Sequence, residues 1–193
     1  MLDENALNTL FFHARTHNGW LPQSVSEAQL RQLFDLMKWA PTSANCSPAR
    51  IVFVQSDQQK AKLVPLMMEG NREKVRTAPV TAIIGMDMAF YEKLPQLFPH
   101  ADAKAWFVGN QALIDSTAFR NSSLQGGYFL MAARALGLDC GPMSGFDGDK
   151  VNEAFFPNST VKVNFICSIG YGDHSKVFGR SPRFAFDEVC QIV

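Results

Sequence analysis

Apolar residues recur at helical spacing in two segments near the start of the chain. The first predicts a helix over residues 3–14. The second opens at Ser26, which stands three residues before Gln29 in a pattern typical of a capping box, and it ends before Pro41. The apolar positions that share a face are, in the first, Ala6, Leu7, Leu10, Phe11 and Ala14, and in the second, Leu30, Leu33, Phe34, Met37 and Ala40.

Three short β-branched runs predict buried strands, over residues 51–54, 80–86 and 161–169. Ser56 predicts the cap of a helix that runs from the first strand to about Met67. The pattern Ser122-x-x-Gln125 predicts the start of a strong helix that ends at Gly137, and Asp147 predicts the cap of one more. Residues 87–110 have no regular period and carry five aromatic residues, Phe90, Tyr91, Phe98, Trp106 and Phe107.

Few strands, many helices and no regular β-α alternation predict an α+β fold, with helices on both faces of a small sheet. The chain has no internal repeat, low-complexity tract or linker-like segment. We therefore expect one domain over residues 1–193.

Composition narrows the class of protein. Charged residues make up 19% and apolar residues 47% of the 193 residues, against about 25% charged in an average domain, so we expect an oligomer. Lys+Arg and Asp+Glu both number 18, which leaves no cationic excess for binding nucleic acid or an anionic membrane. The acidic N-terminus, the absence of a long apolar run and four scattered Cys predict a cytoplasmic protein without a membrane span, structural zinc or disulfide framework.

Common catalytic motifs are absent. Gly170-Tyr171-Gly172 follows a predicted strand, but Ser175 breaks the dinucleotide-binding fingerprint. No phosphate-binding Walker loop and no nucleophile elbow of a serine hydrolase is present. His13 and His17 stand four residues apart, but without a nearby acidic partner they favour a helix-end pair over a metal site, and no metal is expected.

Five polar segments remain as candidates for ligand binding. Arg15-Thr16-His17 offers donors suited to phosphate, although a cation at a helix C-terminus is the commoner interpretation. The loop 41–48 and the turn 141–147 can present backbone groups to a ligand, or can be plain connectors. Asn71 and Lys74 would face one way on a helix, where a solvated charged turn is the usual alternative. The fifth segment, residues 180–183, adds two arginines near the end.

Taken in order, these segments resemble the nitroreductase family of FMN-dependent oxidoreductases. The resemblance covers nearly the whole chain and rests on Arg15-Thr16-His17, residues 40–50, the alanine-rich helix before Gly137, residues 141–147 and the terminal arginines. Residues 40–50, 122–126 and 141–147 look closest to the branch that reduces malonic semialdehyde to 3-hydroxypropionate in pyrimidine degradation. The resemblance implies a three-layer α/β/α homodimer with a mostly antiparallel central sheet, in which the C-terminal segment reaches across the partner.

The resemblance also implies roles for single residues toward FMN. Arg15, Thr16 and His17 would hold the phosphate and ribityl chain, and Arg180 or Arg183, with Arg183 favoured, would close on the phosphate. Asn71 and Lys74 would face the pyrimidine edge of the flavin, with Lys74 a cation beside the reduced ring. The remaining predicted contacts are Ser43, Asn45 and Ser47, from either subunit, and Pro142, Met143, Ser144 and Gly145 at the N5 side.

The resemblance implies ping-pong turnover, in which NAD(P)H reduces the flavin and a small organic acceptor reoxidises it, with no catalytic side chain. Nitro compounds and quinones are alternative acceptors. A non-catalytic flavin-binding protein and a cofactor-free hydrolase that uses Cys46 with His13 or His17 are the two other hypotheses. The aromatic residues of 87–110 could cover the second substrate or pack at a dimer interface.

Overall fold

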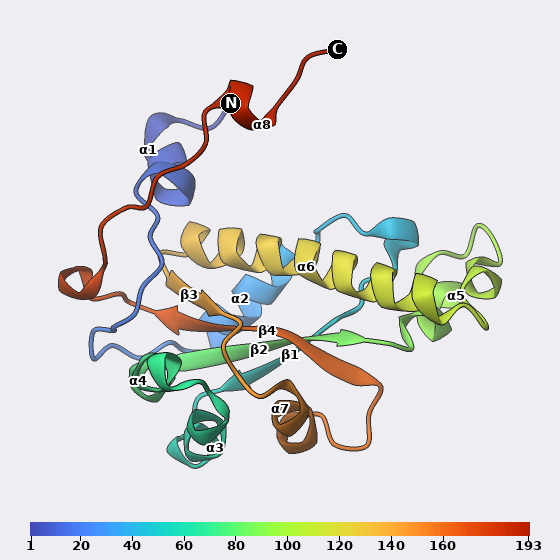
Figure 1. Cartoon of the computed structure of the whole chain (residues 1–193), viewed down its shortest axis with the longest axis horizontal. Helices are drawn as coiled ribbons and strands as arrows, with labels where there is room; N and C mark the ends of the chain where they lie inside the picture. The colour runs from blue at the N-terminus through green and yellow to red at the C-terminus, as the bar shows by residue number, and fades with distance from the viewer.

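The computed structural model describes residues 1–193, and a four-stranded antiparallel sheet lies at its centre (Figure 1). The order of the strands is β1-β2-β4-β3, so β1 and β3 are the edges. The strands are β1 (Ala49–Val54), β2 (Val80–Asp87), β3 (Asp139–Met143) and β4 (Val161–Gly170). The three predicted strands are confirmed, whereas β3 occupies residues that the sequence predicted as part of a turn.

Helices cover both faces of the sheet (Figure 1). On one face lie α2 (Glu27–Met37) and α6 (Gln111–Ala135). On the other lie α3 (Asp57–Leu63), α4 (Glu69–Thr77) and α7 (Gly148–Phe155). A cluster that includes Leu33, Ile84 and Phe129 fills the first layer, and one that includes Leu63, Ile83 and Val151 fills the second. The structure is therefore the expected three-layer α/β/α arrangement.

Local capping explains where several helices begin. Ser26 and Gln29 form both hydrogen bonds of a capping box at α2, and Asp147 accepts from Lys150 N at the start of α7, as predicted. The predicted start of the long helix at Ser122 is wrong, because α6 begins eleven residues earlier, after the Asn110 cap. Ser122 and Gln125 instead lie buried inside α6. The hydroxyl of Ser122 donates to a carbonyl of β2, and the side-chain oxygen of Gln125 accepts from a backbone N–H of β1.

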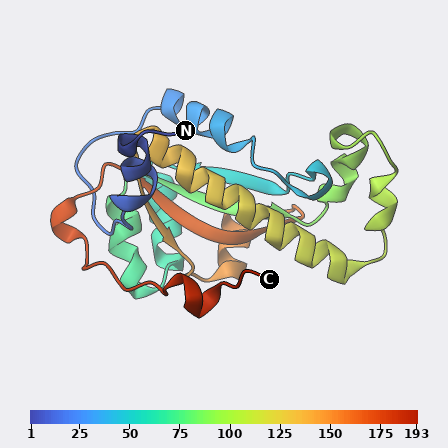
Figure 2. The ribbon, with the colours of Figure 1, turned by 90° about the horizontal axis from the view of Figure 1, so that it is seen from above.

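The two ends of the chain stand apart from the three layers. The N-terminal segment is α1 (Glu4–Leu7) followed by a π-helical turn over Asn8–Phe12. The last sixteen residues, 178–193, are exposed throughout and contain only one short helix, α8 (Phe186–Val189). Figure 2 shows this tail running outside the helix layers. The tail therefore contributes nothing to the core of its own chain.

The aromatic segment, residues 87–110, packs against the first turns of α6 as a third, separate core (Figure 1). It contains two 3₁₀ turns, Phe90–Lys93 and Ala103–Trp106, and the short helix α5 (Leu94–Leu97). Phe90 and Phe107 are buried and contact each other edge to face, whereas Trp106 is half exposed. Phe90 and Phe107 therefore stabilise the fold of the aromatic segment, whereas Trp106 remains available to a ligand or a second chain.

Candidate cofactor site

Four arginines from distant parts of the chain line one cavity of about 550 Å³. Arg15 comes from the N-terminal segment, Arg134 from the last turn of α6, and Arg180 and Arg183 from the tail. None of the four forms an ion pair with a carboxylate. Guanidinium groups gathered without counter-charge favour an anion, and their forked donors match phosphate.

The two chain ends hold each other at this cavity. The guanidinium of Arg15 donates to the carbonyl of Phe178, and that of Arg180 donates to the carbonyls of Phe12 and Ala14 at 2.7 and 3.3 Å. Arg183 donates to the carbonyls of its neighbours Ser181 and Pro182, so it lies at the cavity without crossing to the other end. Both predicted tail arginines thus line the cavity with Arg15.

Arg134 is the member of this cavity that the sequence did not single out. Its guanidinium donates to the carbonyl of Leu10 at 3.0 Å, which ties α6 to the N-terminal segment. In the sequence it is a cation in the last turn of a helix, an arrangement that the helix dipole favours anywhere. No local signal therefore separates it from an ordinary surface arginine.

His17 does not join Arg15 at the cavity. Thr16 and Asn18 line it, but the ring of His17 is fully buried on the other side of the segment. The segment runs beside β3, with a hydrogen bond from His17 N to the carbonyl of Cys140, and alternation along it places the ring of His17 opposite the cavity-lining Thr16 and Asn18. The expectation that the side chain of His17 contacts the phosphate is therefore corrected.

The ring of His17 instead faces the carboxylate of Asp139, with Nε2 3.3 Å from Oδ1. Burial raises the pKa of Asp139, but the interaction with His17 and the hydrogen bond from Gly172 N outweigh it and hold the pKa below its usual value. The ring of His174 contacts that of His17 edge to face, with the centroids 5.0 Å apart.

A second group of predicted residues meets at the end of β3. Asn71 and Lys74 lie on α4, so the helical interpretation of this segment is confirmed. The amide of Asn71 donates to the carbonyl of Gly145 at 3.0 Å, and Nζ of Lys74 lies 3.5 Å from the carbonyl of Pro142. The structure therefore brings Asn71 and Lys74 together with the 142–145 segment.

Lys74 is an unusual residue because it is only 5% exposed and has no carboxylate partner. Burial lowers the pKa of its ammonium group. A Cβ on Gly141 would lie 2.5 Å from Cε of Lys74, so only glycine leaves room for the lysine stem. A buried, unpaired cation is costly to the fold and marks a candidate functional residue.

The four residues of the 142–145 segment differ in what they can offer a ligand. Pro142 and Met143 belong to β3, and the side chain of Met143 packs into the core beside α7. The prediction that Met143 borders the flavin can therefore hold only for its backbone. Ser144 is exposed, and a Cβ on Gly145 would lie 2.7 Å from the amide nitrogen of Asn71.

The loop that carries Ser43, Asn45 and Ser47 lies against the N-terminal half of α6, away from Arg134. The amide side chain of Asn121 accepts from Ser43 N at 2.8 Å, and Asn45 donates to the carbonyl of Leu97. Asn121 and Arg134 are thirteen residues apart on α6, a separation of about 20 Å along the helix axis. The structure therefore does not bring the three loop residues to the arginine cavity of the same chain.

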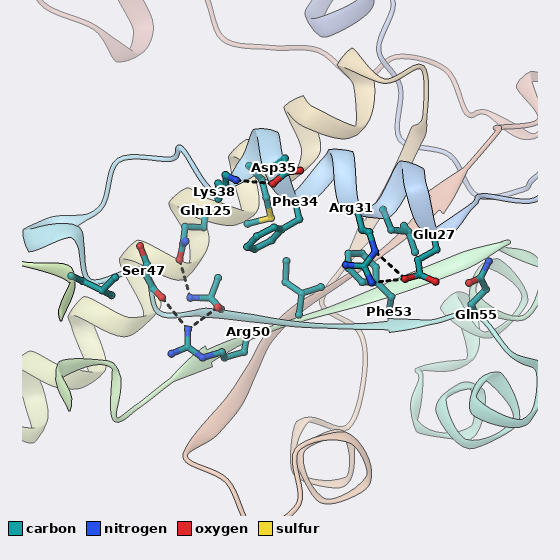
Figure 3. Close-up of a pocket in the computed structure, with 15 residues that line it drawn as sticks. Glu27, Arg31, Phe34, Asp35, Lys38, Ser47, Arg50, Phe53, Gln55 and Gln125 are labelled. Carbon is teal, nitrogen blue, oxygen red and sulfur yellow. Dashed lines mark hydrogen bonds and ion pairs between the residues drawn. The ribbon is translucent and has the colours of Figure 1, made fainter. Parts of the chain in front are cut away.

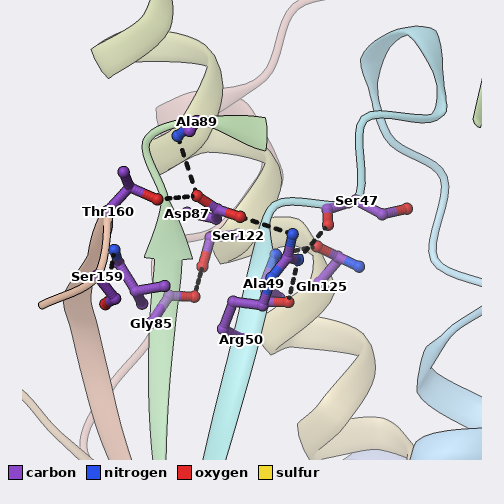
Figure 4. Close-up of polar contacts among 11 residues, drawn as sticks. Ser47, Ala49, Arg50, Gly85, Asp87, Ala89, Ser122, Gln125, Ser159 and Thr160 are labelled. Carbon is purple, nitrogen blue, oxygen red and sulfur yellow. Dashed lines mark hydrogen bonds and ion pairs between the residues drawn. The ribbon is translucent and has the colours of Figure 1, made fainter. Parts of the chain in front are cut away.

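This loop is held in a strained backbone. Ala44, Asn45 and Ser47 have φ values of 49°, 51° and 39°, in the left-handed region that favours glycine. Polar groups buried beneath it fix the shape, since Gln125 accepts from Ala49 N at 2.8 Å and Asp87 pairs with Arg50 at 2.7 Å (Figure 4). Strain retained over three of four residues is typical of functional loops.

A larger groove of about 1110 Å³ opens between α2 and the edge strand β1 (Figure 3). Its floor is apolar, with Phe34, Ile51 and Phe53, and its rim carries the ion pair Arg31–Glu27. Ser47 lies at one end of the groove. The sequence did not predict this groove, because Phe34 sits at a core-like position of α2 yet is 52% exposed.

The structure is unfavourable to the hydrolase hypothesis. Burial raises the pKa of the Cys46 thiol to about 11, which keeps it protonated at neutral pH. Cys46 is part of the strained loop and packs into the core formed with residues 90–118, whereas His17 lies beside Asp139, away from this core, and His13 is exposed. No helix combines the length and the hydrophobicity that crossing a bilayer requires.

Comparison with known proteins agrees with the fold. The sequence model of the Nitroreductase family matches residues 14–171. A protein of Polynucleobacter asymbioticus named "Putative NADH dehydrogenase/NAD(P)H nitroreductase" is 62% identical over 193 residues, which is 100% of this chain and 98% of that protein.

Two crystal structures share the fold at low identity. One, a nitroreductase candidate from Exiguobacterium sibiricum in complex with FMN, has a TM-score of 0.87 and 19% identity over 100% of this chain and 99% of that chain. The other, CLA-ER, an enone reductase of gut-bacterial fatty acid saturation, has a TM-score of 0.82 and 17% identity over the whole of both chains.

Proposed function

This chain belongs to the nitroreductase family, and we propose that it is an FMN-dependent oxidoreductase that uses NAD(P)H to reduce a small organic acceptor. The observation that carries the proposal is the cavity lined by Arg15, Arg134, Arg180 and Arg183, which offers phosphate four guanidinium groups and no competing carboxylate. We place the FMN phosphate there, within a single FMN-binding domain over residues 1–193.

Lys74 and Asn71 would orient the flavin ring. Bound FMN supplies the hydride chemistry, and the chain supplies position and charge. A cation fixed in a buried site stabilises negative charge on a neighbouring group far better than one in water, and Lys74 has no carboxylate to neutralise it. Asn71 offers an amide beside it, and the backbone of Ser144 and Gly145 offers N–H donors without a requirement for a particular side chain.

We further propose a homodimer in which the tail of each chain crosses to its partner. The tail carries six exposed large apolar residues, which no part of its own chain covers: Phe178, Phe184, Phe186, Val189, Ile192 and Val193. Strand β1 has an unpaired edge beside the apolar groove at Phe34 and Phe53, which suits an incoming extended segment. In such a dimer each chain supplies Ser43, Asn45 and Ser47 to the FMN of its partner, because this loop does not reach the arginine cavity of its own chain.

The identity of the electron acceptor is the most specific part of the proposal. The name of the 62% identical relative supports nitro compounds or quinone-like acceptors. The similarity of residues 40–50 to the malonic semialdehyde branch supports reduction of that aldehyde in pyrimidine degradation, in the cytoplasm. Comparing kcat/KM for malonic semialdehyde, a quinone and a nitroaromatic compound under one set of conditions decides between them.

An absorbance spectrum of the purified protein tests the function. We expect a yellow protein with about one FMN per chain, which NADH or NADPH bleaches and an added acceptor restores. A protein that stays yellow after nucleotide addition would be the non-catalytic flavin-binding protein. A colourless protein that does not retain added FMN contradicts the whole proposal.

A further inference from the structure

A group of three metal-ligating side chains lies outside the proposed cofactor cavity. His17, Asp139 and His174 each offer a ligand atom, and the three atoms all lie within 4.8 Å of one another. They come from the N-terminal segment, the start of β3 and the 3₁₀ turn His174–Lys176 that precedes the tail. The first two are not surface groups, since His17 is fully buried and Asp139 is partly buried.

The buried ring of His17 lacks ordinary hydrogen bonds. Neither Nδ1 nor Nε2 has a hydrogen-bond partner, although buried polar atoms are almost always satisfied. Nε2 lies 3.3 Å from Oδ1 of Asp139, yet the direction is wrong for a hydrogen bond between them. A third atom that binds both would satisfy the ring nitrogen and the carboxylate oxygen together.

The spacing fits a metal ion. Two ligands at about 2.1 Å from Zn²⁺ in a tetrahedral site lie about 3.4 Å apart, close to the 3.3 Å observed between Nε2 and Oδ1. The exposed His174 can move to shorten its distance, because no hydrogen bond fixes its ring. Two imidazoles and one carboxylate are ligands that Zn²⁺ commonly takes, with a fourth position left for water.

The surroundings hold these ligands in place. Oδ2 of Asp139 accepts from Gly172 N at 2.9 Å, which orients the carboxylate so that Oδ1 faces the histidines. A Cβ on residue 172 would lie 1.9 Å from Nδ1 of His17, so glycine at this position leaves the space that the ring occupies. We propose that His17, Asp139 and His174 bind one Zn²⁺ ion per chain, which ties the root of the tail to the N-terminal segment that carries Arg15.

Zinc binding to the full-length protein tests the proposal. After treatment with a chelator and its removal, we expect the protein to bind one Zn²⁺ per chain at micromolar free metal, and Zn²⁺ to raise the thermal unfolding midpoint. His174→Ala changes an exposed side chain and should leave the fold intact while it lowers the zinc affinity by at least about 10- to 100-fold. His13→Ala removes an exposed histidine of the same segment that lies outside the group, and it should bind zinc as the parent does.

Each other outcome overturns the site. Absence of stoichiometric zinc at micromolar free metal means that His17 and Asp139 form a buried pair without metal. Equal affinity in the parent and His174→Ala, or loss in His13→Ala, places the zinc elsewhere. The readout is independent of flavin, because equilibrium dialysis with Zn²⁺ alone gives the same answer in a yellow or a colourless preparation.

Discussion

Helix α6 contacts two groups of predicted cofactor-site residues at different positions along its length. The two groups differ in whether one chain brings them together. At the C-terminal end, Arg134 meets Arg15, Arg180 and Arg183 in one cavity, although these residues are separated by up to 168 positions. About 20 Å along the helix, near its middle, Asn121 anchors the strained loop of Ser43 and Asn45, which does not reach the cavity of its own chain. One half is assembled within a chain, and the other is held rigid away from it, which is the arrangement that the proposed site shared between two copies requires.

Removing residues 184–193 gives the largest expected change in FMN affinity and oligomeric state. The truncated chain keeps all four arginines but loses the apolar part of the tail, so we expect a monomer whose FMN affinity falls by about 100-fold or more as the partner's loop is lost. Sedimentation and flavin fluorescence titration measure the two effects, and circular dichroism checks the fold. A truncated monomer that binds FMN as tightly as the parent would refute the shared site, and a truncated dimer would refute the crossing tail.

Arg15→Ala tests the half that one chain assembles. A charge-assisted hydrogen bond to phosphate is worth about 1.5–3 kcal/mol, so the FMN dissociation constant should rise by about 10- to 150-fold. Arg76→Ala is the control, since Arg76 is exposed and pairs only with Glu73, away from the arginine cavity and the apolar groove. If Arg15→Ala retains flavin as tightly as the parent, the phosphate does not bind at this cavity.

Asn121→Ala tests the strained loop that carries Ser43, Asn45 and Ser47. The substitution leaves Ser43 N without its partner, and an unsatisfied backbone donor costs about 1–3 kcal/mol in the free energy of unfolding. Turnover should fall as well, because the strained loop loses its anchor. Ser116→Ala, which removes an exposed hydroxyl from the same helix, should change the unfolding free energy far less in a urea titration. Equal effects of the two would show that the anchor is not specific.

Lys74→Met gives the smallest expected effect on stability, with the opposite sign. Since burial lowers the pKa of Lys74, the unfolded chain binds this proton more tightly than the folded one. Stability of the parent without cofactor should therefore rise with pH between the folded and the unfolded pKa values. Lys74→Met should remove that slope and raise the unfolding free energy at neutral pH by about 1 kcal/mol, while flavin reduction by NAD(P)H slows. Urea titrations at several pH values and stopped-flow absorbance measure the two, and a destabilised variant would contradict the role of an unpaired cation.

Where polar side chains act locally, the sequence was sufficient. Ser26 and Gln29 cap α2 as their spacing predicts, and Asp147 caps α7. The same pattern misled at Ser122 and Gln125, because these buried polar groups satisfy the backbone of β2 and β1 instead of a helix end. A spacing rule cannot distinguish the two, since the partner lies in another element.

Strand β3 was missed for a related reason. Gly141 and Pro142 are typical of turns, and proline is excluded from central strands because it lacks an N–H. β3 is an edge strand whose outer side carries only the isolated bridge of Thr16 to Cys140, so Pro142 is tolerated there. Arg15 with the tail arginines was found from the resemblance, whereas Arg134 and the burial of His17 depend on how the N-terminal segment packs on β3 and α6.

The crossed contacts between the two ends have a consequence for the lifetime of the protein. Arg15 donates to a tail carbonyl and Arg180 donates to two carbonyls of the N-terminal segment, so four like charges gather around one cavity. A bound anion relieves this mutual repulsion and fastens both termini at once. We therefore expect added phosphate or FMN to slow proteolysis at both termini together, because one anion would reinforce the contacts that already join them.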